Sequence, residues 1–162
     1  MTLLLVAAGT IAKMCLPYNF KSELTHITGL EDLKNMEDYL NQIKQLEDSA
    51  GARIKLTVEN VELGLGKPLF NKATSKIAAF LFVVPGVKGV LFGDDFITDN
   101  LLGSTYNDVY VNEFGKTKTN HSGGFNGGLT NGNTLIVNVD MRPASSIRKE
   151  QTTYNFEKKS LI

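Results

Sequence analysis

Five of the fifteen glycines lie within residues 123–132, and this cluster constrains the fold more than any other feature of the sequence. Glycine reaches positive φ angles that other residues avoid, so a dense cluster indicates tight turns or a close approach of the backbone to a ligand. The pair Asn131-Gly132 stands before a strand pattern at 134–139 and predicts a type I′ hairpin turn. A glycine-rich hairpin without chemistry and a backbone cradle for an anion are both open interpretations at this point.

The rest of the chain mixes helical and strand periodicities, which predicts an α+β domain. The apolar spacing predicts helices at 3–16, 35–47 and 69–84 and strands at 52–61, 87–92 and 134–139. The helix at 3–16 is apolar on most sides, so we expect it to be buried in a core. We expect residues 17–34 to form a loop with room for one strand, turning at Gly29, and the polar residues 93–124 to form a long loop.

Composition excludes several classes of protein. With 162 residues, 42% of them hydrophobic and 21% charged, the chain has the balance of a single soluble domain. Its 17 basic and 17 acidic side chains give a formal charge of zero, so we expect no nucleic-acid partner and no anionic membrane surface as partner. The charge is uneven, however, at −4 over residues 31–48 and +3 over 141–162. The basic end suits an anion, and two solvated faces of opposite sign are the simpler alternative.

The expected cellular location and metal chemistry follow from the N-terminal apolar run, the single cysteine and the two histidines. The apolar run Leu3 to Ala8 has no cationic residues before it and is interrupted by Lys13, so it fits neither a signal peptide nor a membrane span. A single cysteine, Cys15, cannot form an internal disulfide, and we expect a cytoplasmic protein. His26 and His121 are the two histidines, and their spacing predicts no metal site.

Four further patterns are candidate sites of chemistry. Residues 115–117 lack the glycine that a P-loop requires five positions earlier, and Ser145 and Ser146 lack the G-x-S-x-G context of a serine hydrolase. Asp94 and Asp95 follow a predicted strand, where carboxylates act as bases or metal ligands, although a solvated turn is the simpler interpretation. His121 is an acid/base candidate with a structural hydrogen bond as its alternative.

The segment 120–132, Asn-His-Ser-Gly-Gly-Phe-Asn-Gly-Gly-Leu-Thr-Asn-Gly, is followed after one strand by Arg-Pro-Ala-Ser-Ser-Ile at 142–147. Together these two segments resemble the most distinctive motif block of the chorismate synthase family. Supporting matches occur in the family's order and spacing at 6–13, 48–51, 64–70 and 85–90. The resemblance therefore extends over most of the chain.

The resemblance implies a fold in which helices pack between antiparallel sheets, usually in a homotetramer. Residues 1–162 would form one incomplete domain of this type, with 13–34 and 93–122 as its loop-rich parts. Family members have about twice this length, and the G-E-S-H-G and R-H-D-P segments of the family find no match here. We therefore expect a chain truncated at both ends that exposes apolar surface and self-associates.

The resemblance also implies a function. Family members convert 5-enolpyruvylshikimate 3-phosphate to chorismate and phosphate in the shikimate pathway, by a 1,4-anti elimination that requires reduced FMN. The positions that match flavin-contacting segments of the family are Pro85, Gly86, Gly127, Arg142, Pro143, Ala144, Ser145 and Ser146. The family's two catalytic histidines have no counterpart here, so no catalytic residue is assigned. The alternative is a truncated, inactive remnant or a flavin-binding or assembly protein.

Overall fold

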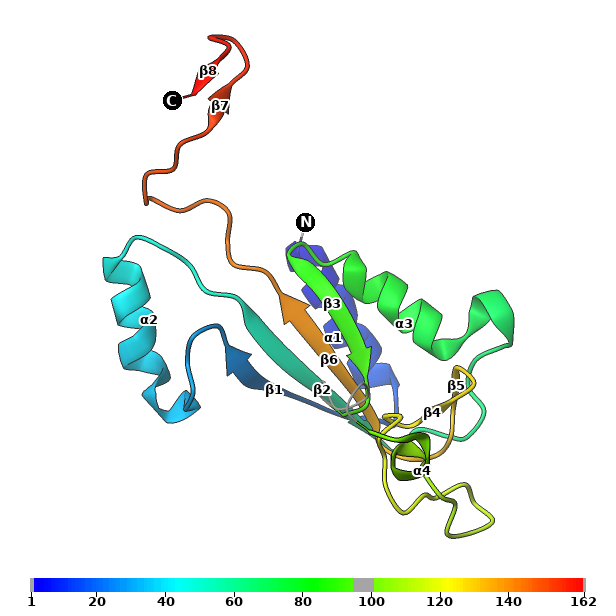
Figure 1. Ribbon diagram of the computed structural model, residues 1–162. Coiled ribbons are helices and arrows are strands. Elements are labelled where there is room, and N and C mark those ends of the chain that lie inside the picture. The colour runs from blue at the N-terminus through cyan, green and yellow to red at the C-terminus, as the bar shows by residue number, and fades with distance from the viewer. Residues whose placement is uncertain (1, 95–100, 162) are drawn as a thin grey trace.

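The centre of the structure, a computed structural model that describes residues 2–94 and 101–161, is a four-stranded antiparallel sheet (Figure 1). The strands lie in the order β1-β2-β6-β3. Their bounds are Asn19–Ile27 for β1, Ala52–Glu59 for β2, Leu135–Met141 for β6 and Val87–Phe92 for β3. Two small hairpins, β4 (Phe125–Asn126) with β5 (Leu129–Thr130) and β7 (Tyr154–Asn155) with β8 (Ser160–Leu161), complete the strands of the described residues.

The helices are arranged around this sheet. They are α1 (Thr2–Cys15), α2 (Met36–Gln45), α3 (Ala73–Phe82) and the short α4 (Gly103–Tyr106), with 3₁₀ turns at Leu33–Asn35 and Leu69–Asn71. The α+β class predicted from the sequence is confirmed. The described residues supply one large sheet, and α1 and α3 border the same face of it.

Most of the predicted elements are present with shifted ends. The strands predicted at 52–61, 87–92 and 134–139 correspond to β2, β3 and β6, and the helix predicted at 35–47 corresponds to α2. Residues 17–34 hold a strand of nine residues rather than mostly loop, because β1 pairs with β2 along its whole length, from Asn19 opposite Glu59 to Ile27 opposite Ala52. The predicted turn at Gly29 follows directly, with φ of 81°.

Two local predictions were wrong in detail. The helix expected from residue 69 begins at Ala73, because Lys72 has an extended backbone with ψ of 143° and separates α3 from the preceding 3₁₀ turn. The hairpin turn expected at Asn131-Gly132 lies instead at Gly127-Gly128, between β4 and β5. Both of these glycines have positive φ, as a type I′ turn requires, whereas Asn131 does not.

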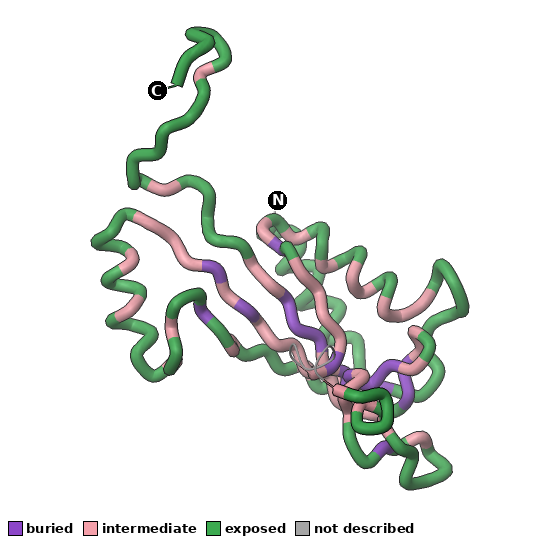
Figure 2. The backbone as a smooth tube through the Cα atoms, in the orientation of Figure 1, coloured by how far each residue is buried: buried purple, intermediate pink, exposed green. Residues whose placement is uncertain are grey.

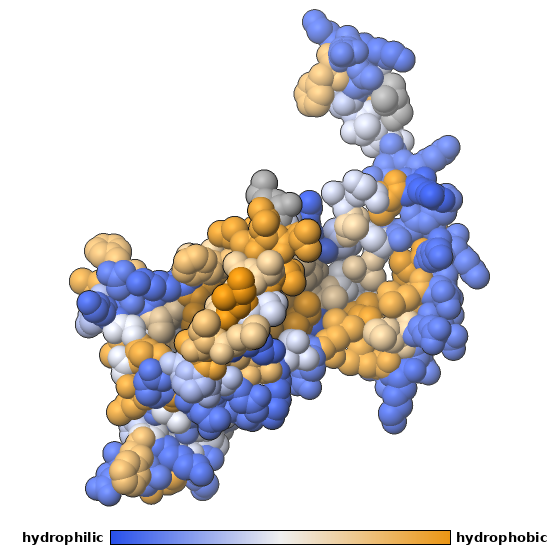
Figure 3. All heavy atoms as spheres, turned by 180° about the vertical axis from the view of Figure 1, so that it is seen from behind, coloured by the Kyte–Doolittle hydropathy of each residue, from blue (hydrophilic) through white to orange (hydrophobic). Residues whose placement is uncertain are grey.

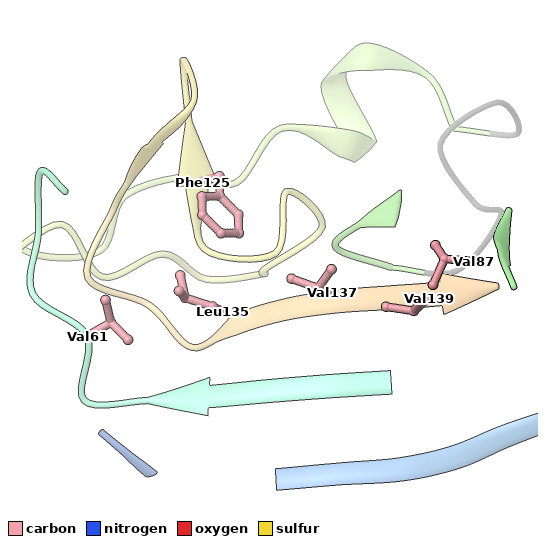
Figure 4. Close-up of a cluster of buried hydrophobic side chains, with 6 residues drawn as sticks. All are labelled: Val61, Val87, Phe125, Leu135, Val137 and Val139. Carbon is pink, nitrogen blue, oxygen red and sulfur yellow. The ribbon is translucent and has the colours of Figure 1, made fainter. Parts of the chain in front are cut away.

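The hydrophobic core runs along β6, from the glycine-rich segment at its start to the first residue of β3 near its end (Figure 4). Alternate residues of β6 point to one face of the sheet because side chains of a strand alternate between its faces. These residues pack with Phe125, whose ring meets that of Phe92 edge to face at 5.1 Å between centroids. The buried apolar members of this cluster are Val61, Val87, Phe125, Leu135, Val137 and Val139. Burial is accordingly concentrated in the strands (Figure 2).

The expectation that the first helix is buried was wrong. No residue of α1 is buried, and Leu3, Leu4 and Met14 are 78%, 74% and 82% exposed. Near its end Lys13 and Leu16 border an apolar groove of about 510 Å³ that also contacts β1, β2, β6 and α3. The other sides of α1 face solvent, and apolar residues gather on that side of the molecule (Figure 3). This agrees with the expectation of exposed apolar surface. Among the described residues, no helix has the length and apolarity to span a membrane.

Candidate functional site

Two of the predicted flavin-contacting segments meet at one edge of the sheet. Antiparallel pairing of β3 with β6 places Val87 opposite Met141, so the turn Pro85-Gly86 that leads into β3 lies beside the residues that follow β6. The backbone N–H of Arg142 donates to the carbonyl oxygen of Gly86 at 2.9 Å. The fold thus brings together segments that are 56 residues apart in the sequence.

The run Arg142, Pro143, Ala144, Ser145 and Ser146 has no helical or strand structure, and all five residues are exposed. Exposed hydroxyls of the two serines and the guanidinium of Arg142 form a set of hydrogen-bond donors without a neighbouring carboxylate in the run itself. Such a donor set is suited to an anionic or polyhydroxylated ligand.

The loop after α2 runs along this segment and holds it. Ser49 Oγ donates to the carbonyl oxygen of Ala144 at 2.7 Å. The carbonyl oxygen of Glu47 accepts the N–H groups of Arg148 at 3.2 Å and Lys149 at 3.1 Å. Residues 47–51 therefore hold the middle of the exposed run and the residues that follow it. The sequence motif at 48–51 marks this loop, but it did not indicate that the loop contacts residues 144–149.

An open groove of about 550 Å³ lies between α2, this loop and residues 144–148. Its walls combine the apolar face of α2 with polar groups of the two loops; the lining residues include Leu40, Ile43, Lys44, Asp48, Ser49, Ala144, Ser146, Ile147 and Arg148. The N–H of Ser49 and, less strongly, the ammonium group of Lys149 hold the pKa of Asp48 below its usual value. Asp48 is therefore ionised at neutral pH and paired with Lys149, at 3.3 Å, within the same chain.

An ion pair anchors the end of β6 just before the exposed run. Arg53 Nε and Asp140 Oδ1 are 2.6 Å apart, and a second nitrogen of the guanidinium donates to Oδ2 at 2.9 Å. The hydrogen bonds from Arg53 lower the pKa of Asp140 despite its partial burial. His26 lies opposite Arg53 in the register of β1 and β2, and this gives His26 a charged neighbourhood that its sequence context did not predict. The bidentate pair fixes the direction in which the chain leaves the sheet.

The fold does not bring Gly127 to the edge of the sheet at which Gly86 and Arg142 meet. Gly127 lies in the β4–β5 turn, which precedes the first residue of β6, whereas Arg142 follows the last residue of β6 (Figure 1). The seven residues of β6 separate the two positions by about 20 Å of extended strand. A contact of Gly127 with the same ligand is a prediction that the arrangement within this chain does not support.

His121 and Asp94 form a second polar cluster at that far end of the sheet. His121 Nδ1 and Asp94 Oδ2 are 2.5 Å apart, and the ring of Tyr106 stacks on the imidazole with 5.9 Å between centroids. The carboxylate of Asp108 accepts the N–H groups of His121 and Ser122 at 2.8 and 2.9 Å. Burial opposes ionisation of Asp108, but these hydrogen bonds lower its pKa overall. The cluster ties the long loop to the glycine segment, which favours the structural interpretation of His121.

The remaining candidates carry no chemistry that the structure supports. Asp95 lies outside the described residues, and Cys15 is an exposed free thiol on α1. Within residues 2–94 and 101–161, no three His, Cys, Asp or Glu side chains are grouped so as to bind a metal ion.

Fold and site together define an α+β protein in which a four-stranded antiparallel sheet presents a basic, serine-bearing run at one edge. The family model described as chorismate synthase matches residues 1–162. This chain belongs to the chorismate synthase family.

Similar proteins agree with this assignment. The chorismate synthase of Chitinophaga pinensis is 41% identical over 159 residues, which are 97% of this chain and 47% of that protein. The chorismate synthase of Prochlorococcus marinus is 32% identical over 189 residues, covering 97% of this chain and 52% of the relative. A crystal structure of chorismate synthase matches the fold with a TM-score of 0.72 at 21% identity, covering 82% of this chain and 51% of the other. The chain thus spans about half the length of the relatives that it matches.

Proposed function

We propose that this chain supplies the flavin-binding edge of a chorismate synthase. The reaction would be the FMN-dependent 1,4-anti elimination of phosphate from 5-enolpyruvylshikimate 3-phosphate, which gives chorismate for aromatic amino acid biosynthesis. The observation that carries the proposal is the hydrogen bond from Arg142 N–H to Gly86 O, because it joins two of the segments that the resemblance assigns to flavin contact. A cytoplasmic location and a homotetramer, as is usual in the family, belong to the same proposal.

The residues at this edge fit the cofactor. Arg142 is positioned to pair with a phosphate group, and the hydroxyls of Ser145 and Ser146 can donate to phosphate or ribityl oxygens. Gly86 has a φ of 94°, which favours glycine, and a Cβ atom there would contact only the end of the Met141 side chain, at 3.3 Å. Reduced FMN, when bound, supplies electron density that assists departure of the phosphate without net redox change.

The chain's own residues would bind and orient the anionic ligand. Arg142 supplies a positive charge that attracts anionic ligands to the run, whereas in the neighbouring groove Lys44 and Arg148 are balanced by Glu47 and Asp48. Leu40 and Ile43 contribute apolar surface to the wall of the groove. No proton transfer is assigned to a residue at this edge.

Equilibrium binding of FMN tests the proposal. We expect the wild-type chain to quench FMN fluorescence on titration and Arg142→Ala to weaken binding about tenfold or more, since one charge-assisted contact is worth about 1.5–3 kcal/mol. Lys118→Ala is the matched control, because Lys118 is an exposed cation in the loop at the far end of the sheet. Equal affinities for wild type, Arg142→Ala and Lys118→Ala would contradict this assignment of the site.

Turnover distinguishes the enzyme from a binding or assembly protein. Under anaerobic conditions with reduced FMN and 5-enolpyruvylshikimate 3-phosphate, we expect the 162 residues alone to form chorismate orders of magnitude more slowly than full-length relatives. The reason is that no residue here matches the family's catalytic histidines or its phosphate-binding arginines. Addition of a polypeptide that carries those segments is expected to raise the rate. FMN binding without any chorismate in that mixture would favour the non-catalytic alternative.

A further inference from the structure

The exposed run 142–146 has few internal bonds of its own. It contains no helix or strand, and the backbone bond from Arg142 to Gly86 holds its first residue. Beyond that residue, the contacts that fix the described run come from the loop after α2. The conformation of the proposed flavin site is therefore set by residues 47–51, which lie about 95 positions earlier in the sequence.

We propose that Ser49 is a positioning residue for flavin binding, acting through the carbonyl group of Ala144. This inference rests on the proposed function. The Oγ of Ser49 donates to Ala144 O at 2.7 Å, in the middle of the run, whereas the neighbouring backbone bonds hold its first residue, Arg142, and the later residues 148 and 149. Loss of the hydroxyl would release Ala144 and loosen the residues that follow it, including Arg148 and Lys149, whose N–H groups donate to Glu47 O.

The surroundings of Ser49 show that the loop itself is held rigidly. Asp48 Oδ1 accepts the N–H of Ser49 at 2.8 Å, and Asp48 Oδ2 pairs with Lys149. At Gly51, a Cβ atom would lie 3.0 Å from Met141 O and 3.3 Å from the ring of Pro143, so the two segments are in close backbone contact there. The carbonyl oxygen of Gly51 also accepts the N–H of Thr28 at 2.9 Å. These contacts hold the loop that carries the Ser49 hydroxyl in a fixed position.

The backbone conformation of Glu47 contributes to the same support. Its φ is 56°, a conformation that residues other than glycine seldom adopt, directly after the end of α2. In this conformation its carbonyl oxygen accepts two N–H groups, those of Arg148 and Lys149. The positive φ belongs to the C-terminal cap of α2, in which Glu47 N–H donates to Lys44 O and Asp48 N–H to Ile43 O, so the helix end itself directs the Glu47 carbonyl.

Three variants and two measurements test the inference. We expect Ser49→Ala to weaken FMN binding about twofold to tenfold, the factor corresponding to one ordinary hydrogen bond, and Ser49→Thr to restore most of the affinity because it keeps a hydroxyl. The control is Thr117→Ala, which also removes a hydroxyl bond to a backbone carbonyl, but in the loop at the far end of the sheet. Equal losses in Ser49→Ala and Thr117→Ala, or no rescue by threonine, would overturn the positioning role.

Amide hydrogen exchange without FMN separates this inference from the proposed function. In Ser49→Ala we expect faster exchange at Arg148 and Lys149 and unchanged exchange at Val137 in the core. If the wild-type chain fails to bind FMN, the proposed function fails, and the exchange result still decides whether Ser49 orders the run. Unchanged exchange at residues 148 and 149 would contradict the inference whatever the flavin result.

Discussion

The substitution Gly93→Ala tests most directly whether this fold requires glycine at a close contact between two backbone segments. Gly93 ends β3 with φ of 90°, and a Cβ atom built there overlaps the carbonyl oxygen of His121 and lies 2.9 Å from Gly123 N. For Gly93→Ala, the left-handed backbone costs about 1–2 kcal/mol. The required shift also strains the bonds from Gly93 N to Ile136 O and from Asp94 N to His121 O, each worth about 1 kcal/mol. We therefore expect a loss of about 3–4 kcal/mol in the free energy of unfolding.

Urea unfolding followed by far-UV circular dichroism measures this loss. With a slope of about 2 kcal/mol per molar urea, the midpoint of Gly93→Ala should fall by about 1.5–2 M. Gly103→Ala is the matched control, because a Cβ atom there meets nothing within 4 Å and the residue begins the short helix α4. Its stability should change by less than about 0.5 kcal/mol. A loss below about 1 kcal/mol in Gly93→Ala would refute the contact between β3 and the glycine segment.

Three further predictions follow from single features of the structure. Glu47→Gly should raise stability by about 1 kcal/mol in thermal unfolding, because glycine adopts the positive φ at this helix end without strain. Replacing Leu4 and Ile11, which are 74% and 64% exposed, by glutamate should reduce self-association in size-exclusion chromatography and leave the unfolding midpoint unchanged. Because Arg53 lowers the pKa of Asp140 in the folded state, the pair stabilises the protein above the unfolded pKa of about 3.9, and this stabilisation is lost as the pH falls through the folded value. Unfolding measured below about pH 4 should therefore show a flatter pH dependence in Asp140→Asn.

The sequence predicted the elements whose periodicity is local. The stripe of α2 and the alternation in β2 and β6 are each readable within about ten residues, and those elements formed near their predicted bounds. β1 was underestimated because its alternation is broken by a bulge between Leu24 and His26, and pairing with β2 decided its conformation. The turn at Gly127-Gly128 was assigned to Asn131-Gly132 because both dipeptides have the residue types of such a turn, and tertiary contacts chose between them.

The residues of the candidate site remain a prediction from the resemblance, and the sequence did not show how the fold would bring them together. The run 142–146 and the pair Pro85-Gly86 came from family resemblance, and the antiparallel pairing of β3 with β6 explains why they meet. The support by Ser49 depends on a contact between residues 95 positions apart, which no local pattern encodes. The burial expected for α1 follows from its apolar composition, but composition does not specify what covers a helix.

Thermal unfolding of the wild-type chain with and without FMN tests the central claim most directly. A ligand at about 100 times its dissociation constant adds about 2.7 kcal/mol to the folded state, provided that it binds the unfolded chain negligibly. We predict a cooperative transition that moves upward with FMN in the wild type and moves much less in Arg142→Ala at the same concentration. An unshifted transition in the wild type at saturating FMN would contradict the claim that this edge of the sheet forms a flavin site.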